Sequence, residues 1–378
     1  MKIIKPKVIF INHFSISGAT LLYSLFDNHP DVILIPAFLD FPRFWKENNF
    51  TKNEKFTTVL NALYKWNNLF EKKEKSKIQN VGKKYESVII KDKKRFIELT
   101  KLNWKSHKIT WTELFYLVHH TYCLLRGINF TNLKFIICHP HGFDNIDKMS
   151  NDIVDSKVIH ILRDPRAANY SYKITHRQIR LKLKKSFQLE PHKPDIYFPY
   201  LSMRLFALAD IKNFFKDKKK HKIIRFEDLH LDSKKVMQNI CRWIGLEWKN
   251  SLLTSSFMGK TWGGNSVSGK LIFSFSKSKA KDKKWLYNLS RDEVILYEAL
   301  CAKYLKKFKY KFAFKQSKIK AFIVFFKLYF LSVKETSCII KKYFLLSTDK
   351  DKIKNLFLFS LKQLRFIIAF LFFFIISR

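Results

Sequence analysis

Five short apolar runs, each followed by loop residues or by the start of a helix, constrain the fold of this chain most strongly. The first run, KVIFIN, has no polar alternation, which is typical of a strand buried on both faces. Strands that alternate with helices predict a parallel sheet whose ligand site lies at the carboxyl ends of the strands. The predicted strands comprise residues 7–12, 32–35, 134–138, 157–162 and 221–226.

Helical patterns fill the segments between these runs. ATLLYSLFDN has its apolar residues at helical spacing and ends before Pro30, which stops a helix. WTELFYLVHHTYCLLRG, residues 111–127, predicts a second helix with a glycine at its C-terminal end. Residues 46–108 are rich in lysine and asparagine and contain broken helical patches. We expect this segment to be a helical insertion that faces solvent.

The loop between the first strand and the first helix consists of small residues where an anion could meet bare backbone N–H groups. It contains no lysine and no arginine. Two interpretations are open: a phosphate-binding loop that lacks its charge, or a simple turn between strand and helix. The residues concerned are Ser15, Ser17, Gly18, Ala19 and Thr20.

A second candidate site follows the strand at 157–162. Arg163 comes directly after this strand, where its guanidinium can bind an anion through two N–H groups. Pro165 then starts a helix, and Ser171 lies about two turns along it. The alternative interpretation is structural, with Arg163 paired to Asp164 and Ser171 a surface hydroxyl.

The net charge of +41 raises the question of nucleic-acid binding. Lysine, asparagine, isoleucine and phenylalanine are all abundant, as expected from AT-biased coding. Arginine, which binds bases and phosphates bidentately, makes up only 13 of the 72 basic residues. We therefore attribute the charge to coding bias and to attraction to anionic partners, and expect no specific nucleic acid.

Cysteine usage indicates a reducing compartment. The five cysteines are far apart and form no CxxC pair, so neither a disulfide framework nor a zinc site is predicted. The apolar run VIFI near the start is too short for the core of a signal peptide. We expect a cytoplasmic protein that binds no metal.

Four motifs in the same order resemble the sulfotransferases that use 3′-phosphoadenosine 5′-phosphosulfate. The first is Ser15-Ile16-Ser17-Gly18-Ala19-Thr20 with its helix and the HP stop, and the second is RDPR followed, after four intervening residues, by Ser171. The third and fourth are residues 223–248, which contain FEDL, and 283–310, which begin KKWLYNLS. WGGNSVSG lies where the family has a mobile loop over the nucleotide. Any one motif alone would be weak.

This resemblance implies a three-layer α/β/α fold like that of P-loop kinases, with a central parallel sheet, over residues 1–310. It also implies transfer of a sulfuryl group to a hydroxyl, or an amine, of a saccharide or lipid-linked saccharide. Arg163 and Ser171 would bind the 3′-phosphate. The other expected nucleotide-binding residues are Ser15, Ser17, Gly18, Ala19, Thr20, Leu21 and Lys284.

The sequence departs from the family at Ile16, where an arginine or lysine is expected to stabilise the bridging oxygen as the bond breaks. Ala19 also replaces a threonine. Either another cation takes over, from Arg43, Lys284 or the lysines of 277–284, or the enzyme is slow or inactive. The alternatives to a sulfotransferase are a catalytically impaired nucleotide-binding protein, a P-loop-like kinase, although GxxxxGK[ST] is absent, and a basic adaptor on membranes or nucleic acid.

An acceptor hydroxyl also needs a general base. The family places a carboxylate or histidine after the second strand, where this chain has Asp40. His13 precedes the small-residue loop, and His139 follows the strand at 134–138. We take Asp40, His13 and His139 as candidates, although a lone histidine is more often structural.

Residues 311–378 form a separate C-terminal extension, predicted to be helical. They carry 14 basic and 3 acidic residues, and lysines 320, 327, 334 and 341 recur every seven residues, which makes one stripe on a helix. The apolar tail 366–376 has 11 residues, fewer than the roughly 20 that span a bilayer. We expect attachment to the anionic inner face of the membrane, the alternative being a helical pair packed on the enzyme.

Overall fold

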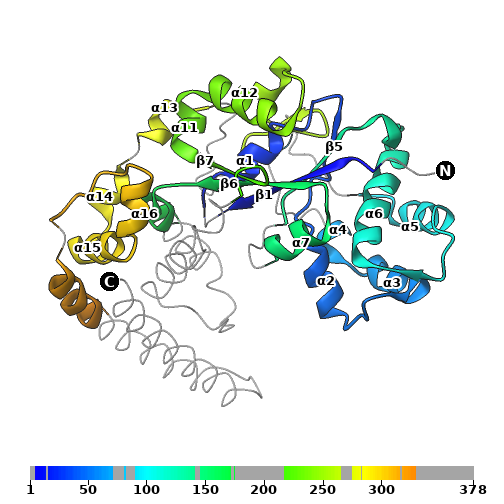
Figure 1. The fold of residues 1–378 in the computed structure, drawn as a ribbon, viewed down its shortest axis with the longest axis horizontal. Coiled ribbons are helices and arrows are strands. Elements are labelled where there is room, and N and C mark those ends of the chain that lie inside the picture. Colours follow the sequence, from blue (N-terminus) through cyan, green and yellow to red (C-terminus); the bar gives the residue numbers. More distant parts are fainter. Residues whose placement is uncertain are drawn as a thin grey trace, which may run out of the picture. The chain divides into compact units, whose positions relative to one another are not determined.

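The computed structural model describes residues 5–13, 16–70, 81, 90–140, 145–171, 174, 217–264, 275–281, 283–315 and 317–328. The chain divides into two compact units, which we treat separately. The first unit comprises Met1–Arg163 and Lys212–Lys281, and the second comprises Asp164–Ile211 and Asp282–Arg378. Figure 1 labels many of the elements of both units.

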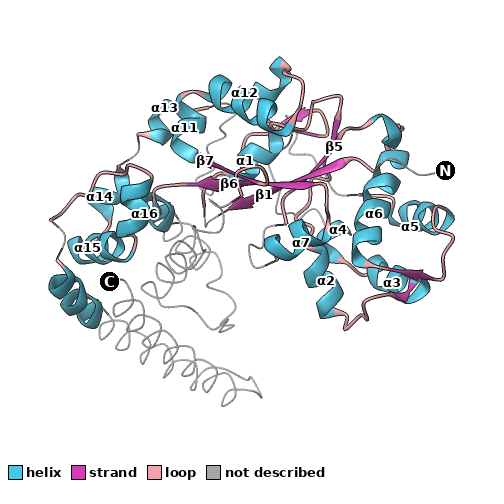
Figure 2. Ribbon diagram, in the orientation of Figure 1, coloured by secondary structure: helices cyan, strands magenta, loops and turns pink. Residues whose placement is uncertain are grey.

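A five-stranded parallel sheet forms the centre of the first unit (Figure 2). All five predicted strands are confirmed, although the second is shorter than expected. Along the sheet the order is β2-β5-β1-β6-β7. The strands are β1 (Lys7–His13), β2 (Val32–Ile33), β5 (Phe135–Cys138), β6 (Ser156–Leu162) and β7 (His221–Arg225).

The strand order fixes where a ligand can bind. After β1 the chain goes to the edge strand β2, returns to β5 on one side of β1, and then crosses to β6 on the other side. The connections after β1 and after β6 thus lead to opposite sides of the sheet, and ligands of open parallel sheets bind at the carboxyl ends of the strands where this direction changes. In the register of the central pair, His13 lies opposite Ile161, two residues before Arg163.

Helices surround the sheet on both faces (Figure 1). Those of the first unit are α1 (Ala19–Ser24), α2 (Phe41–Glu47), α3 (Phe56–Tyr64), α4 (Asn67–Phe70), α5 (Lys93–Leu102), α6 (Trp111–Leu125), α7 (Ile146–Asp152), α11 (Phe226–Leu231), α12 (Ser233–Ile244) and α13 (Lys277–Ala280). Short elements between them are β3 (Glu54–Lys55), β4 (Lys108–Ile109), β8 (Ser256–Phe257), β9 (Lys260–Thr261) and the 3₁₀ turns Phe130–Asn132 and Asn250–Leu253.

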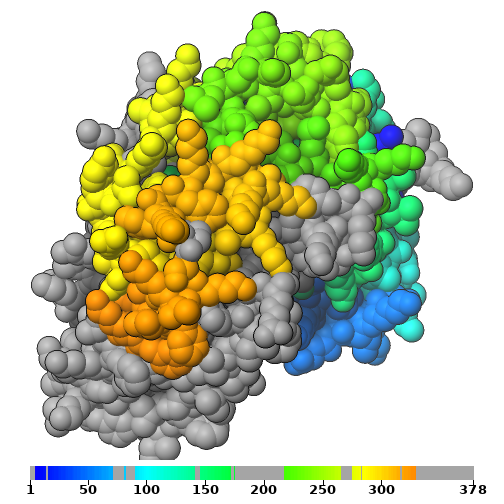
Figure 3. All heavy atoms as spheres, turned by 60° about the vertical axis from the view of Figure 1, so that its left-hand side comes forward, coloured from blue at the N-terminus to red at the C-terminus, as the bar shows by residue number. Residues whose placement is uncertain are grey.

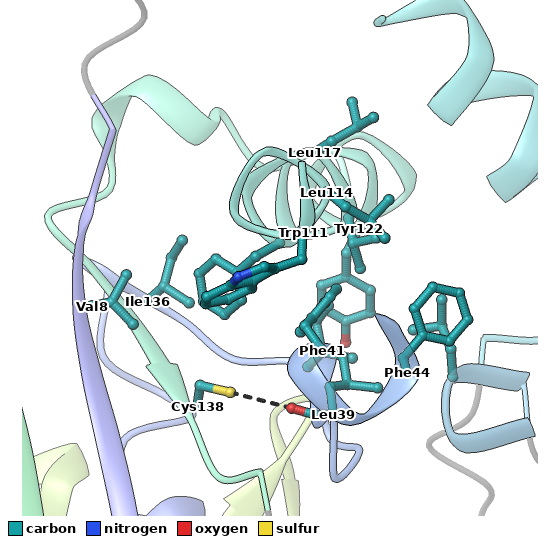
Figure 4. Packing of buried hydrophobic residues seen from close by; sticks show 14 of the residues in the cluster. Val8, Leu39, Phe41, Phe44, Trp111, Leu114, Leu117, Tyr122, Ile136 and Cys138 are labelled. Carbon is teal, nitrogen blue, oxygen red and sulfur yellow. Dashed lines mark hydrogen bonds between the residues drawn. The ribbon is translucent and has the colours of Figure 1, made fainter. Parts of the chain in front are cut away.

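Alternate residues of β1 pack into two different cores, which is why residues 8–11 of the strand are all apolar. Val8 and Phe10 belong to a cluster with α2, α3, α5 and α6, while Ile9 and Ile11 belong to a cluster with α1, α11 and α12. Figure 4 shows the first cluster, in which side chains of β1 and β5 face those of α2 and α6. At its edge the Cys138 thiol donates to the Leu39 carbonyl oxygen at 3.9 Å.

The described parts of the segment 46–108 contain the helices α3, α4 and α5 and the short strand β3, and they have both exposed and buried side chains. Lys52 and Lys65 lie in solvent, whereas Phe56, Leu63 and Phe96 are buried in the first cluster. The expectation of a solvent-facing insertion therefore holds for its lysines alone. Its apolar residues sit at helical spacing and extend the core beyond α6.

A buried arginine organises the second unit. Arg166 donates from Nε and Nη2 to the two carboxylate oxygens of Asp164, at 2.9 and 2.7 Å, and from Nη1 to Glu298 and to the Lys311 carbonyl oxygen at 2.9 Å. Its guanidinium lies 4.1 Å from the ring centroid of Trp285. The unit's helices span residues 165–171, α14 (Lys284–Asn288), α15 (Arg291–Leu300), α16 (Ala302–Lys307) and residues 318–328.

The first described part of the C-terminal extension packs within this second unit. Glu298 accepts from the backbone N–H groups of Ala313 at 2.6 Å and Phe314 at 3.2 Å. On the helix at 318–328, Phe325 is buried and Lys327 forms a 2.7 Å ion pair with Asp292. Lys334, Lys341 and the apolar tail 366–376 lie outside the described residues.

Candidate functional site

The loop after β1 ends in a glycine with an unusual backbone. Gly18 is the N-cap of α1 and has φ 85°, in the left-handed region that residues with a Cβ avoid. A Cβ built on it would lie 2.5 Å from Cδ2 of Phe226, the first residue of α11. Glycine is therefore required twice, by its backbone angle and by the aromatic ring beside it. Ser15 lies outside the described residues.

Arg163 contacts the same ring. Its guanidinium carbon is 4.6 Å from the ring centroid of Phe226, and its Nη1 donates to the Ile16 carbonyl oxygen at 3.0 Å. The stack Gly18–Phe226–Arg163 thus joins the segments that follow β1, β7 and β6. The sequence predicted the loop and Arg163 as two separate anion-binding groups, and the fold brings them together at one edge of the sheet.

Positive charge gathers around this stack. Burial, followed by the nearby Arg163 guanidinium, lowers the pKa of the Lys279 ammonium on α13. Burial also lowers the pKa of His230 on α11 to about 4, with smaller contributions from Lys279 and Arg163. Two cations held close together in the absence of a ligand repel each other, and an anion between them would remove that repulsion.

The loop also contains an unpaired hydroxyl. Ser17 is 1% exposed, and its Oγ has no hydrogen-bond partner among the residues that the structure describes. Leaving a buried hydroxyl unpaired costs about 1–3 kcal/mol, which a ligand oxygen would recover. Ile16, in contrast, is 37% exposed, and its aliphatic side chain contributes neither a charge nor a hydrogen-bond donor.

The positions of the other predicted nucleotide-binding residues do not by themselves indicate a role in binding. Ala19, Thr20 and Leu21 form the first turn of α1 and lie next to Gly18. Ser171 and Lys284 belong to the second unit, where Ser171 is half-buried and Lys284 is exposed. Their roles stay predictions.

Asp40 has the contacts of a structural carboxylate. It is the N-cap of α2, where its Oδ1 accepts from the Arg43 N–H at 3.0 Å. The Asn145 side-chain amide donates to both of its oxygens, at 3.0 and 2.9 Å. Arg43, one candidate for the missing cation, lies 3.9 Å from the same carboxylate.

His13 and His139 lie together at the carboxyl ends of β1 and β5. Their ring centroids are 5.1 Å apart in an edge-to-face arrangement. His139 Nδ1 is 3.0 Å from the Ile11 carbonyl oxygen, which can only accept, so Nδ1 carries the proton. A neutral His139 ring therefore has its lone pair on Nε2, the state that a general base requires.

Comparison with known proteins assigns the family. The model of the sulfotransferase family matches residues 9–250, which include most of β1, the other four strands of the sheet, the loop, Arg163 and Phe226. This chain belongs to the sulfotransferase family. No curated protein sequence matches the chain significantly.

Solved structures similar to this sulfotransferase have low sequence identity to it. The sulfotransferase domain from the curacin biosynthetic pathway is 14% identical, with a TM-score of 0.50 over 82% of this chain and 99% of that one. The sulfotransferase domain from a Synechococcus olefin synthase is 16% identical, with a TM-score of 0.44 over 81% and 96%. A mouse sulfotransferase complexed with PAP is 12% identical, with a TM-score of 0.36 over 79% and 85%.

The described residues contain no group of three His, Cys, Asp or Glu side chains that could hold a metal ion. None of the helices in the described ranges is both long and apolar enough to cross a membrane.

Sequence reasoning missed two residues of this candidate site, Phe226 and His230, and included Lys279 only as one of the lysines of 277–284. It noted FEDL only as part of the third motif. A usable signal was present, because Phe226 directly follows a predicted strand, as Arg163 does. Asn169, on the helix at 165–171 of the second unit, was also missed. It is 2% exposed, and neither of its amide atoms has a partner in the described part of the chain.

The contact between Gly18 and Phe226 predicts an unequal cost for two glycine substitutions. Gly245, which ends α12, has φ 84° and no atom within 4 Å of a built Cβ. Gly245→Ala should therefore cost only the left-handed backbone penalty, about 1–2 kcal/mol. Gly18→Ala should cost about 1–3 kcal/mol more, because the new methyl group overlaps the ring.

Urea unfolding of both variants measures the difference. In a Phe226→Ala background the excess cost of Gly18→Ala should disappear, since the ring is gone. Equal costs for the two glycine substitutions in the wild-type background would show that Phe226 does not restrict the loop.

Proposed function

We propose that this sulfotransferase transfers a sulfuryl group from 3′-phosphoadenosine 5′-phosphosulfate to a hydroxyl, or an amine, of a saccharide or lipid-linked saccharide. The observation that carries the choice of donor is the Gly18–Phe226–Arg163 stack. It holds a small-residue loop and a guanidinium at one edge of the sheet, as a ligand with two anionic groups requires. The saccharide class of acceptor rests on the family resemblance.

The chemistry needs positioning and fixed donors more than covalent help from the protein. In the transition state, negative charge spreads over the sulfuryl oxygens and the bridging oxygen to the phosphate. Backbone N–H groups at Gly18 and Ala19 and the unpaired Ser17 hydroxyl would stabilise this charge. Arg163 and Ser171 would bind the 3′-phosphate, and the aromatic face of Phe226 supports the guanidinium.

We expect the histidine pair, rather than Asp40, to deprotonate the acceptor. His139 has its Nδ1 proton on the Ile11 carbonyl oxygen, which leaves Nε2 as a base, and His13 lies beside it. The carboxylate of Asp40 already caps α2 and binds Asn145. A second candidate function, nucleotide binding without transfer, is favoured by the missing loop charge at Ile16.

The first test concerns the nucleotide. Arg163→Ala should weaken binding of adenosine 3′,5′-bisphosphate by about 1.5–3 kcal/mol, the range for a hydrogen bond to a charged group. It should weaken adenosine 5′-phosphate much less, because that ligand has no 3′-phosphate. Isothermal calorimetry measures both, with the exposed Arg242→Ala as the matched control. Equal losses for the two nucleotides would refute the role of Arg163, and no binding of the bisphosphate to the wild type would refute the donor.

The second test restores the missing charge. Ile16→Lys and Ile16→Arg should raise the rate of sulfuryl transfer and change donor affinity little, because the added charge acts as the bond breaks. Leu102→Lys, at an exposed position on α5, adds the same charge elsewhere and should leave the rate unchanged. A fall in rate for both Ile16 variants would mean that another cation already serves the bridging oxygen. Transfer that is undetectable in the wild type and in both variants, across a wide acceptor panel, would support the non-catalytic function.

We also propose that residues 311–378 attach the protein to the anionic inner face of the cytoplasmic membrane. On the helix at 318–328, Ile319 is 76% exposed and Ile323 is 61% exposed, beside the exposed Lys320. Residues of this helix are among the orange atoms on the surface in Figure 3. Exposed apolar side chains next to a lysine suit a lipid interface.

Vesicle sedimentation tests this attachment. Ile319→Ser combined with Ile323→Ser should weaken binding to phosphatidylserine vesicles severalfold, and added salt should weaken it further. Val154→Ser, at an exposed position of the first unit, is the control. Truncation after residue 328 is preferable to deletion of 311–378, because Glu298 binds the N–H groups of Ala313 and Phe314. Absence of the full-length protein from the vesicle pellet would contradict the proposal.

A further inference from the structure

The imidazole of His230 is a buried polar group to which no role has yet been assigned. It lies four residues after Phe226 on α11, so both side chains are on the same face of that helix. The two ring centroids are 4.3 Å apart at an interplanar angle of 68°. The ring centroid of Phe275, just before α13, lies 6.1 Å from that of the imidazole. His230 therefore belongs to the Gly18–Phe226–Arg163 stack.

The hydrogen bonding of His230 fixes which nitrogen carries the proton. The backbone N–H of Ser276 donates to Nδ1 at 3.0 Å, so Nδ1 must hold a lone pair. In the neutral ring the proton is then on Nε2. His230 is only 4% exposed, and Nε2 has no hydrogen-bond partner within the described ranges. The ring thus holds a buried N–H donor without an acceptor, an arrangement that proteins rarely retain without a ligand.

The charged groups around the ring indicate which kind of hydrogen-bond acceptor the Nε2–H group could meet. Arg163 and Lys279, which follow β6 and lie on α13, act on His230 with positive charge, and the two aromatic rings offer no oxygen. With burial these cations hold the pKa of His230 at about 4, so the ring is neutral at pH 7. An anion bound by Arg163 and Lys279 would offer Nε2–H an oxygen.

We propose that His230 is a further nucleotide-binding residue, whose Nε2–H donates to a phosphate oxygen of the ligand that Arg163 binds. The proposal rests on the proposed function, since it takes that phosphate to be the 3′ group of the sulfuryl donor. The bond from Ser276 to Nδ1 gives His230 a second effect, because it fixes the segment that carries Lys279 against α11.

Two amide substitutions separate the nitrogens of the ring. Asparagine places an oxygen near Nδ1 and can still accept from Ser276, but it removes the donor at Nε2. Glutamine places an N–H near Nε2 and keeps that donor. At neutral pH, His230→Asn should weaken binding of adenosine 3′,5′-bisphosphate at least about tenfold, and His230→Gln less than about threefold. Binding of adenosine 5′-phosphate should change less than about threefold in both variants.

Calorimetry with these two nucleotides provides the measurement, with melting temperatures to show that each variant is folded. NMR of the wild-type protein with isotope-labelled histidine gives a readout that needs no variant. The Nε2–H signal of His230 should shift downfield with adenosine 3′,5′-bisphosphate and stay in place with adenosine 5′-phosphate.

The outcomes distinguish the two proposals. If the wild type binds the bisphosphate but His230→Asn binds it equally well, the role of His230 is wrong and the proposed function stands. Equal losses for both nucleotides in both variants, without the NMR shift, would mean that the imidazole only packs on Phe226 and Phe275. If the wild type does not bind the bisphosphate, the proposed function fails and the role of His230 fails with it.

Discussion

The contact between Gly18 and the ring of Phe226 is the constraint on which the candidate site depends. It leaves no room for a side chain at the end of the β1 loop, and it positions an aromatic face for the Arg163 guanidinium. Three strands that are far apart in the sequence therefore end at one small volume. Because β1 lies between β5 and β6, this volume is at the point where the connections diverge, and no long loop is needed to build it.

The two arginines of the RDPR motif have different roles three residues apart. Arg163 is half-buried and extends to the loop, whereas Arg166 is 2% exposed and lies between two carboxylates. Removing one partner of such a buried group leaves an uncompensated charge, which is strongly destabilising. We infer that Arg166 holds the second unit together through Glu298 and the chain at 311–314, whereas Arg163 contacts the β1 loop of the first unit.

Ile16 brings no positive charge to the loop, but other segments of the first unit hold cations nearby. Arg163 reaches the Ile16 carbonyl oxygen from β6, and Lys279 approaches Arg163 from α13. A chain with a net charge of +41 does not lack cations, and what matters is which of them are held near the loop. Asp40 illustrates the same point for carboxylates, because its oxygens are already bound by Arg43 N–H and Asn145.

The sequence by itself determined the five strands, the loop at Gly18 and the position of Arg163, because each depends on local pattern: uninterrupted apolar runs, small residues before a helix, an arginine directly after a strand. Only the tertiary structure decided that Phe226 and His230 belong to the site, and that the apolar face of 46–108 extends the core. These features arise from contacts between residues far apart in the chain, such as Ser276 with His230. Local periodicity shows that a residue has an apolar face, but not which strand end or helix that face meets.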